Sequence, residues 1–290
     1  MGYLWMIISC FFYALMGVLV KAASDTFTSS QLVAARGLFA IIVIGLWAFF
    51  THNTLKTQHL KAHLSRSVCG TVSLLCWFIA IALIPISTAM TLGNATPICM
   101  AFIVIAADFI KHRQTNWTLV FSAIVGFTGV ATIFRPQLNT DLTGLLFAVT
   151  SSLITAMSYI QIRALAQLKE PVWRVVFYFS VVNLAFGLGL APLDSGEALF
   201  NVTAIDWILV IGIGLCGLIA QLAVTKAFAN TNLLASTILS FSVIVFGLVF
   251  GFLCFDDPID SFSLLGTAAI IVSGVYSTMS VRKRQDESGL

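Results

Sequence analysis

Long apolar segments alternate with short polar ones along the whole chain. The apolar runs cover residues of about 3–22, 29–50, 66–84, 87–107, 116–134, 142–164, 172–191, 205–227, 233–254 and 259–281. A helix needs about 20 apolar residues to cross the hydrocarbon core of a membrane, and each run comes close to that length. The two-residue alternation that indicates a transmembrane barrel is absent. The pattern therefore predicts an all-α membrane protein with ten transmembrane helices.

The composition excludes most soluble functions. Charged residues make up 9% of the chain and hydrophobic residues 59%, and the mean hydropathy is +1.00. Soluble domains carry about 25% charged residues, so this chain uses lipid as its solvent. A cytosolic enzyme, a secreted domain and a nucleic-acid binder are excluded. The six cysteines lie within apolar runs without CxxC spacing, which indicates packing residues and predicts no metal site.

The basic residues predict the orientation in the membrane. If the N-terminus is cytoplasmic, twelve of the 15 Lys and Arg residues, Arg66 included, fall on the cytoplasmic side. Two fall outside, and Arg36 is left as the only charged residue well inside a helix. Since cytoplasmic loops carry the excess of Lys and Arg, we expect both termini in the cytoplasm. The protein is then a multi-pass protein of the cell membrane, in a bacterium the inner membrane, with solvated loop histidines such as His63.

The two halves of the chain share a weak internal similarity. An offset of 142 places Gly2, Leu4, Ser9, Ala14 and Ala22 on Gly144, Leu146, Ser151, Ala156 and Ala164. An offset of 145 places Ala123, Gly129 and Val130 on Ala268, Gly274 and Val275. Because each unit holds an odd number of helices, the units must have opposite topology. We therefore predict two inverted five-helix repeats, 1–138 and 139–290, with a substrate site between them.

Several local motifs carry a resemblance to a known family. They are the run 30–36 (SQLVAAR), Arg66, the run 80–89 (AIALIPISTA), Thr96-Pro97 and Arg135-Pro136. On these motifs the chain resembles the EamA type of the drug/metabolite transporter superfamily over nearly its whole length. The resemblance implies ten helices in two inverted repeats that move small metabolites. That family usually has Glu after helices four and nine, where this chain has Asp108 and Asp257.

Depth along the predicted helices groups polar residues into two layers. The outer layer holds the predicted substrate-binding residues Tyr13, Arg36, Trp77, Thr91 and Asn94. The inner layer, in the second repeat, holds Tyr159, Tyr178, Gln221, Thr237 and Ser240, with Tyr178 at the position equivalent to Arg36. Polar groups inside a membrane are costly and concentrate at function or at helix contacts. Arg36 is the candidate for holding a carboxylate, and the alternative is that it staples helices together.

Proline and glycine indicate the moving parts. Pro97 cannot donate to the carbonyl of Gly93, so the fourth helix must kink or open there, beside Asn94. Carriers use such interrupted helices to bind polar ligands, although neighbouring helices could also satisfy a simple kink. Gly247 and Gly251 form a GxxxG pattern that permits close helix packing. The stripe Ser151, Thr155 and Ser158 is expected to bond its own helix carbonyls.

These observations favour a secondary transporter, an exporter or exchanger of small polar metabolites such as amino acids, working by alternating access. An organic-anion (carboxylate) carrier or a nucleotide-derivative carrier is the alternative within this class, and a channel is the alternative outside it. No enzyme is expected, since the predicted helices contain no buried acid, base or nucleophile set. The expected partners are a small-molecule substrate and the lipid bilayer, with no cofactor, no nucleic acid, and a monomer or homodimer as the assembly.

Overall fold

Helices account for the regular structure throughout the part of the chain that is described. In the computed structural model these are residues 2–96, 98–99, 103, 106, 117–134, 141–193, 203–230, 239–257 and 261–288. The elements are α1 (Gly2–Ala23), α2 (Ser29–Phe50), α3 (Leu60–Leu83), α4 (Ile86–Gly93), α6 (Trp117–Phe134), α7 (Leu142–Gln167), α8 (Val172–Leu190), a 3-10 turn (Ala191–Leu193), α9 (Ala204–Asn230), α11 (Ser242–Phe255) and α12 (Ser261–Ser288).

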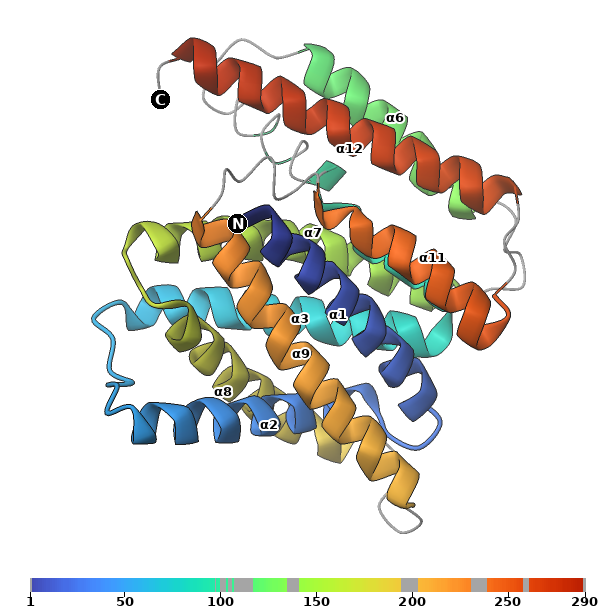
Figure 1. Ribbon diagram of the computed structural model, residues 1–290. Coiled ribbons are helices and arrows are strands. Elements are labelled where there is room, and N and C mark those ends of the chain that lie inside the picture. Colours follow the sequence, from blue (N-terminus) through green and yellow to red (C-terminus); the bar gives the residue numbers. More distant parts are fainter. Residues whose placement is uncertain are drawn as a thin grey trace.

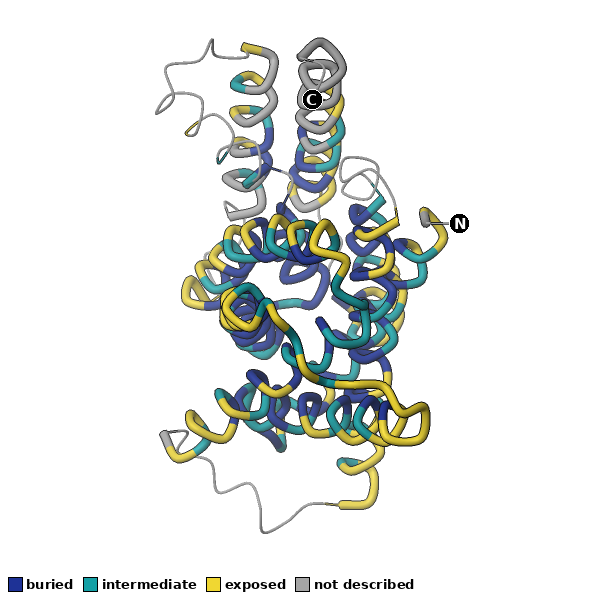
Figure 2. The backbone as a smooth tube through the Cα atoms, turned by 90° about the vertical axis from the view of Figure 1, so that its left-hand side faces the viewer, coloured by how far each residue is buried: buried dark blue, intermediate teal, exposed yellow. Residues whose placement is uncertain are grey.

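The predicted all-α membrane class is confirmed. Six described helices are long and apolar enough to cross a membrane, namely α1, α2, α3, α7, α8 and α9, and shorter apolar helices cover Ser242–Phe255 and Leu264–Ser273. Much of the fourth predicted run, including Pro97, and the start of the ninth at 233–238 lie outside the described residues. Buried residues face the interior of the bundle and exposed apolar residues cover its outside (Figure 2). That distribution suits a protein with lipid around it.

Helices from the two halves of the chain pack against each other in pairs. α1 packs on α9, α3 on α7, α2 on α8 and α6 on α12. The α6–α12 pair lies at one edge of the bundle (Figure 1). At the α2–α8 crossing, a Cβ on Gly37 would lie 2.7 Å from the Ser180 carbonyl oxygen, and one on Gly187 would lie 2.6 Å from that of Ser30. Glycine at both positions lets the two backbones come together without lipid or voids between them.

The fourth helix stops where the sequence predicted a break. α4 ends at Gly93, and Asn94 at its C-cap donates its backbone N–H to Met90 and Leu92 carbonyls. The Asn94 side-chain amide also donates to the Met90 carbonyl, at 2.8 Å. These bonds satisfy carbonyls that a continuing helix would otherwise use. The end of α4 is therefore stabilised by its own capping bonds.

One end of the bundle is held by a group of polar residues that we call the loop clasp: Thr57, His63, Glu170, Arg174 and Tyr178. Arg174 Nη1 donates to Glu170 Oε2 at 2.9 Å, and His63 Nε2 lies 3.4 Å from the same oxygen. Thr57 donates to Glu170 Oε1, and the Tyr178 hydroxyl donates to the Leu55 carbonyl. The clasp thus joins the loop before α3 to the segment between α7 and α8.

The clasp corrects one sequence prediction. His63 was expected on a solvated loop, but its side chain is 0% exposed. The prediction is wrong because α3 begins at Leu60 rather than near 66, so His63 belongs to a helix. Its ring lies 4.8 Å from that of Tyr178 and is covered by it.

The clasp also controls the ionisation of Glu170. Burial opposes the charged carboxylate, but hydrogen bonds from Thr57, Arg174 and His63 outweigh it and hold the pKa of Glu170 below its ordinary value. A carboxyl whose folded-state pKa is lowered stabilises the fold above its ordinary pKa. That contribution is lost as the pH falls through the lowered value.

We expect Glu170→Gln to lower the apparent melting temperature of the detergent-purified protein at pH 7. The expected loss of unfolding free energy is about 1.5–3 kcal/mol, the usual contribution of a hydrogen bond to a charged group. The gap to wild type should narrow as the pH falls from the ordinary glutamate pKa toward the lowered one. Asp25→Asn, at an exposed position, is the matched control. Equal melting temperatures for Glu170→Gln and wild type at pH 7 would contradict this role of the clasp.

Candidate functional site

A polar cavity lies at the centre of the bundle. Its lining is formed by Tyr13, Arg66, Gly70, Ser73, Leu74, Trp77, Gly93, Asn94, Ser151, Thr155, Ser158, Tyr159, Phe179, Gln221 and Val243. The centre of a water molecule can move through about 80 Å³ of this cavity. One buried water requires roughly 10–15 Å³ by the same measure, so the cavity has room for several. Eight of these residues belong to the first half of the chain and seven to the second. The cavity is therefore shared between the halves.

A chain of hydrogen bonds crosses one wall of the cavity. The Tyr13 hydroxyl of α1 donates to Gln221 Oε1 of α9 at 2.8 Å. Arg36 Nη2 of α2 donates to the Gly217 carbonyl at 3.3 Å and to the same Gln221 oxygen at 3.5 Å. Arg36 is 3% exposed and is not among the lining residues. It holds the amide oxygen of Gln221 in place, and Gln221 lines the cavity.

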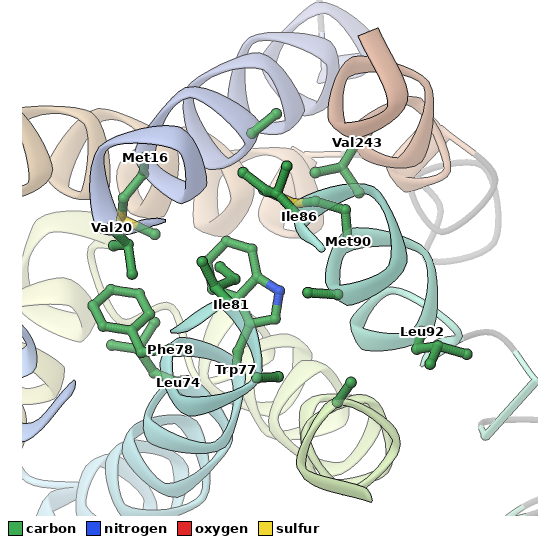
Figure 3. Close-up of a cluster of buried hydrophobic side chains, with 14 of the residues drawn as sticks. Met16, Val20, Leu74, Trp77, Phe78, Ile81, Ile86, Met90, Leu92 and Val243 are labelled. Carbon is green, nitrogen blue, oxygen red and sulfur yellow. The ribbon is translucent and has the colours of Figure 1, made fainter. Parts of the chain in front are cut away.

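Trp77 closes the cavity on the α4 side. Its indole lies between α3, which carries it, and α4, which carries Met90 and Leu92 (Figure 3). The Tyr13 ring meets it edge-on, with centroids 6.3 Å apart. A Cβ on Gly93 would lie 2.7 Å from Trp77 Cδ1, so the last glycine of α4 makes room for the indole. Trp77 Nε1 is buried and has no hydrogen-bond acceptor among the described residues.

Hydroxyl groups line the opposite wall, where α3 meets α7. Ser151 Oγ donates to the Ser73 carbonyl at 2.9 Å, and the hydroxyls of Ser73 and Thr155 are hydrogen-bonded to each other. Ser151 and Thr155 were expected to bond carbonyls of their own helix. This expectation is wrong for both, because their recorded bonds run to Ser73 of α3. Both side chains point across to α3 because that helix packs closely on α7.

A second buried guanidinium reaches the cavity from α3. Arg66 is 2% exposed, and its guanidinium carbon lies 4.1 Å from the centroid of the Phe179 ring. The prediction that Arg36 is the only charged residue inside a helix is wrong for this reason. Arg66 was counted with the loop residues because the apolar run starts at 66. The helix itself starts at Leu60, and Leu60 and Leu64 were signals of that earlier start.

The other predicted site residues divide into two groups. The residues that line the cavity are Tyr13, Trp77, Asn94, Tyr159 and Gln221. Thr91, Tyr178 and Ser240 lie elsewhere: Thr91 donates to the Ser87 carbonyl, Tyr178 belongs to the loop clasp, and Ser240 accepts a bond from Cys10 at its carbonyl. Pro97 and Thr237 lie outside the described residues.

The predicted glycine pattern in α11 packs against α4. A Cβ on Gly247 would lie 2.5 Å from Met90 Cβ, and one on Gly251 would lie 3.1 Å from Ile86 Cγ2. Asp257, just beyond α11, accepts bonds from the backbone N–H and the hydroxyl of Ser87 at the start of α4, both at 2.9 Å. The two helices are therefore in close contact, and a carboxylate ties their ends together.

Gly217 has no room for a larger residue, and we expect Gly217→Ala to destabilise the protein. The new methyl would clash with the Arg36 side chain and lie 3.0 Å from Met16 Sδ. Overpacking of this kind costs about 1–3 kcal/mol. Gly45→Ala is the matched control, since no atom lies within 4 Å of a Cβ there, and it should be neutral or slightly stabilising. The melting temperatures of both variants in detergent measure the effect. If Gly217→Ala melts at the wild-type temperature, Arg36 is loosely held.

Comparisons with known proteins find similar sequences over nearly the whole chain. The model of the EamA-like transporter family matches residues 1–135 and again 142–279. The chain is 25% identical to the pseudopaline exporter of Pseudomonas aeruginosa (strain UCBPP-PA14) over 275 residues, 94% of each chain. It is 22% identical to the S-adenosylmethionine uptake transporter of Rickettsia conorii over 288 residues, 98% of this chain and 95% of that one.

Two further likenesses extend the comparison. The riboflavin transporter of Vibrio cholerae is 22% identical over 293 residues, which cover 98% of this chain and 94% of that one. A solved structure with 15% sequence identity superposes with a TM-score of 0.68 over 98% of both chains. That likeness shows a shared fold.

Proposed function

Since this chain belongs to the EamA-like transporter family, we propose that it exports or exchanges small polar metabolites, such as amino acids, by alternating access. The observation that carries this proposal is the central cavity to which both halves contribute. Aromatic rings, hydroxyls and the Gln221 amide line it. This combination suits a small molecule with a polar backbone and a variable side group. The relatives' names cover both export and uptake and three unlike substrates, so the family alone leaves the substrate open.

Two hydrogen bonds support the inverted repeat on which alternating access rests. Ser9 of α1 donates to the Ala220 carbonyl of α9, and Ser151 of α7 donates to the Ser73 carbonyl of α3, both at 2.9 Å. Ser9 and Ser151 are 142 residues apart, and Ser73 and Ala220 are 147 apart. A two-fold relation between repeats 1–138 and 139–290 exchanges these bonds. The pairing of α1 with α9 and of α3 with α7 follows the same relation.

The α2–α8 crossing obeys this relation as well. Gly37 meets Ser180 and Leu184, and Gly187 meets Ser30 and Ala34. An offset of 150 converts one set of contacts into the other. The offset thus varies between 142 and 150 from helix to helix, as insertions and deletions in the loops would cause. An inverted repeat offers two equivalent arrangements of its halves, and a carrier alternates between them.

Each arrangement requires a gate at each end of the bundle. The loop clasp around Glu170 is the proposed inner gate, since it joins two segments that we place in the cytoplasm. The bond from Thr26 Oγ1 to Asp206 Oδ1, 3.2 Å long, joins the corresponding segments at the outer end. The interrupted helix α4, with Gly93 and Pro97 as its hinge, and its contact with Gly247 and Gly251 of α11 complete the moving parts.

The proposed orientation keeps both termini in the cytoplasm of a bacterial cell, with the protein in the inner membrane as a monomer or homodimer. Placing Arg66 inside α3 reduces the twelve cytoplasmic basic residues to eleven, against two outside. The asymmetry of charge therefore still supports this orientation.

The first test is counterflow in proteoliposomes. We expect an amino acid or a related carboxylate loaded inside to drive uptake of labelled substrate from outside, with saturation. A panel of amino acids, organic carboxylates and nucleotide derivatives distinguishes the proposed substrate class from its alternatives. Uptake that is linear in concentration and lacks counterflow would indicate a channel. No transport of any member of the panel would overturn the proposed function.

The second test concerns orientation. In a variant without the native cysteines, a membrane-impermeant maleimide added to intact cells should label Asp141→Cys and leave Lys61→Cys unlabelled. The charge asymmetry between the two sides is the reason. Permeabilised cells, in which both positions react, provide the control. Labelling at Lys61→Cys alone would reverse the proposed topology.

A further inference from the structure

We propose that Arg66 is the anchor for an oxyanion, above all a carboxylate, of the transported molecule. This inference rests on the proposed function and deepens it. Arg66 lines the cavity, and neither its Nε nor its Nη1 has a hydrogen-bond partner among the described residues. No lining residue is acidic. A buried cation without an anion is costly inside a membrane, which points to a ligand that supplies the negative charge.

The direction of the side chain supports the same role. Arg66 lies six residues after the start of α3, and an arginine there could turn toward the helix end and reach water. Instead, its Nη1 lies so close to Gly70, one turn further into the helix, that a Cβ there would be 2.5 Å away. The guanidinium therefore lies beside the next turn of the helix, where Arg66 and Gly70 both line the cavity.

Gly70 and Phe179 form a seat for this guanidinium. The Phe179 ring lies 4.1 Å from the guanidinium carbon, within the range of cation–π contacts, and Gly70 leaves room for Nη1. The seat consists of carbon atoms, so it leaves the N–H groups of the guanidinium free to donate hydrogen bonds. Those groups lie in the guanidinium plane, in the fork that binds both oxygens of a carboxylate. The indole N–H of Trp77 is a second buried donor without an acceptor in the described part of the cavity.

Arg36 makes a contrast within the same chain. Its Nη2 donates to the Gly217 carbonyl and to Gln221. Its Nε has no partner among the described residues either, but the residue does not line the cavity. Both arginines are at least 97% buried, yet only Arg66 reaches the space that a ligand would occupy. Arg36 is therefore a positioning residue for Gln221, and the anion-binding role predicted for it from the sequence passes to Arg66.

Stability in the absence of ligand gives a first test. Arg66→Met keeps the length of the side chain and removes a charge that has no partner, so its melting temperature should equal or exceed that of wild type. Arg36→Met should melt lower, because it removes bonds to Gly217 and Gln221. If Arg66→Met melts several degrees below wild type without ligand, Arg66 is a structural residue and the proposal fails.

Ligand recognition gives the second test. The probes are matched pairs, each an acid and its amide, such as L-methionine with L-methioninamide and L-glutamine with L-glutaminamide. They are measured by competition in counterflow and by thermal shift in detergent. We expect saturating acid to raise the melting temperature of wild type by about 2–4 °C or more. Arg66→Met should bind the acid about 10–100-fold more weakly, and the preference for acid over amide should disappear.

Two further variants connect the effect to the seat. Gly70→Ala should weaken acid binding in the same way, because its methyl displaces Nη1, while Arg36→Met should keep the acid-to-amide ratio of wild type. Wild type that transports without preferring any acid over its amide overturns the proposal for Arg66 and leaves the proposed function standing. The proposal is equally overturned if no acid stabilises wild type more than Arg66→Met. If wild type transports nothing but binds acids in a way that depends on Arg66, the proposed function is wrong and the proposal for Arg66 remains.

Discussion

The structure depends on one constraint: inside a lipid-facing bundle, each polar group must find its partner within the protein. The backbone groups of the described helices bond within each helix, and many of the polar side chains bond between the two halves of the chain. Ser9 and Ser151 each donate to a carbonyl on a partner helix. Asp257 accepts the backbone N–H of Ser87, which has no partner within α4 because it lies at the start of that helix. Such bonds fix which helix faces are neighbours. Among the described residues whose buried polar atoms have no partner, Arg66 and Trp77 are the two that line the cavity.

Glycines decide where large functional side chains can be placed. Gly217 makes room for Arg36, Gly70 for Arg66 and Gly93 for Trp77, and each would bring a Cβ to within 3 Å of the side chain it faces. Gly70 and Gly217 occupy related places under the 147-residue offset between α3 and α9. Closely packed helices normally exclude a bulky polar side chain. A small residue opposite it is therefore part of the site, although it contributes no chemistry of its own.

The sequence predicted well those features that arise from local chemistry. The helical class follows from apolar length, and the end of α4 at Gly93 follows from the missing N–H of Pro97. Depth along the predicted helices alone selected five residues that line the cavity: Tyr13, Trp77, Asn94, Tyr159 and Gln221. Depth failed for Tyr178, because an offset of 142 does not hold for α8, where the contacts of Gly37 and Gly187 indicate 150.

Arg66 and His63 could not be placed for a different reason. The first residues of α3 are polar in sequence, and they become interior only through packing against α8 and the loop clasp. Their burial is a tertiary effect, invisible in a hydropathy pattern. Contacts between residues more than 100 positions apart set it, as the Tyr178 bond to Leu55 illustrates.

A cation that stays with the protein has an electrical consequence. Arg66 is held in its seat of Gly70 and Phe179, so an anion that binds there leaves without taking the positive charge along. Each molecule of a monovalent anion released outside then carries one negative charge across the membrane. At an inside-negative voltage of about 100 mV this movement releases about 2.3 kcal/mol, equal to an approximately fiftyfold concentration ratio. The resting voltage of the cell would thus bias such a carrier toward export, without a coupled ion.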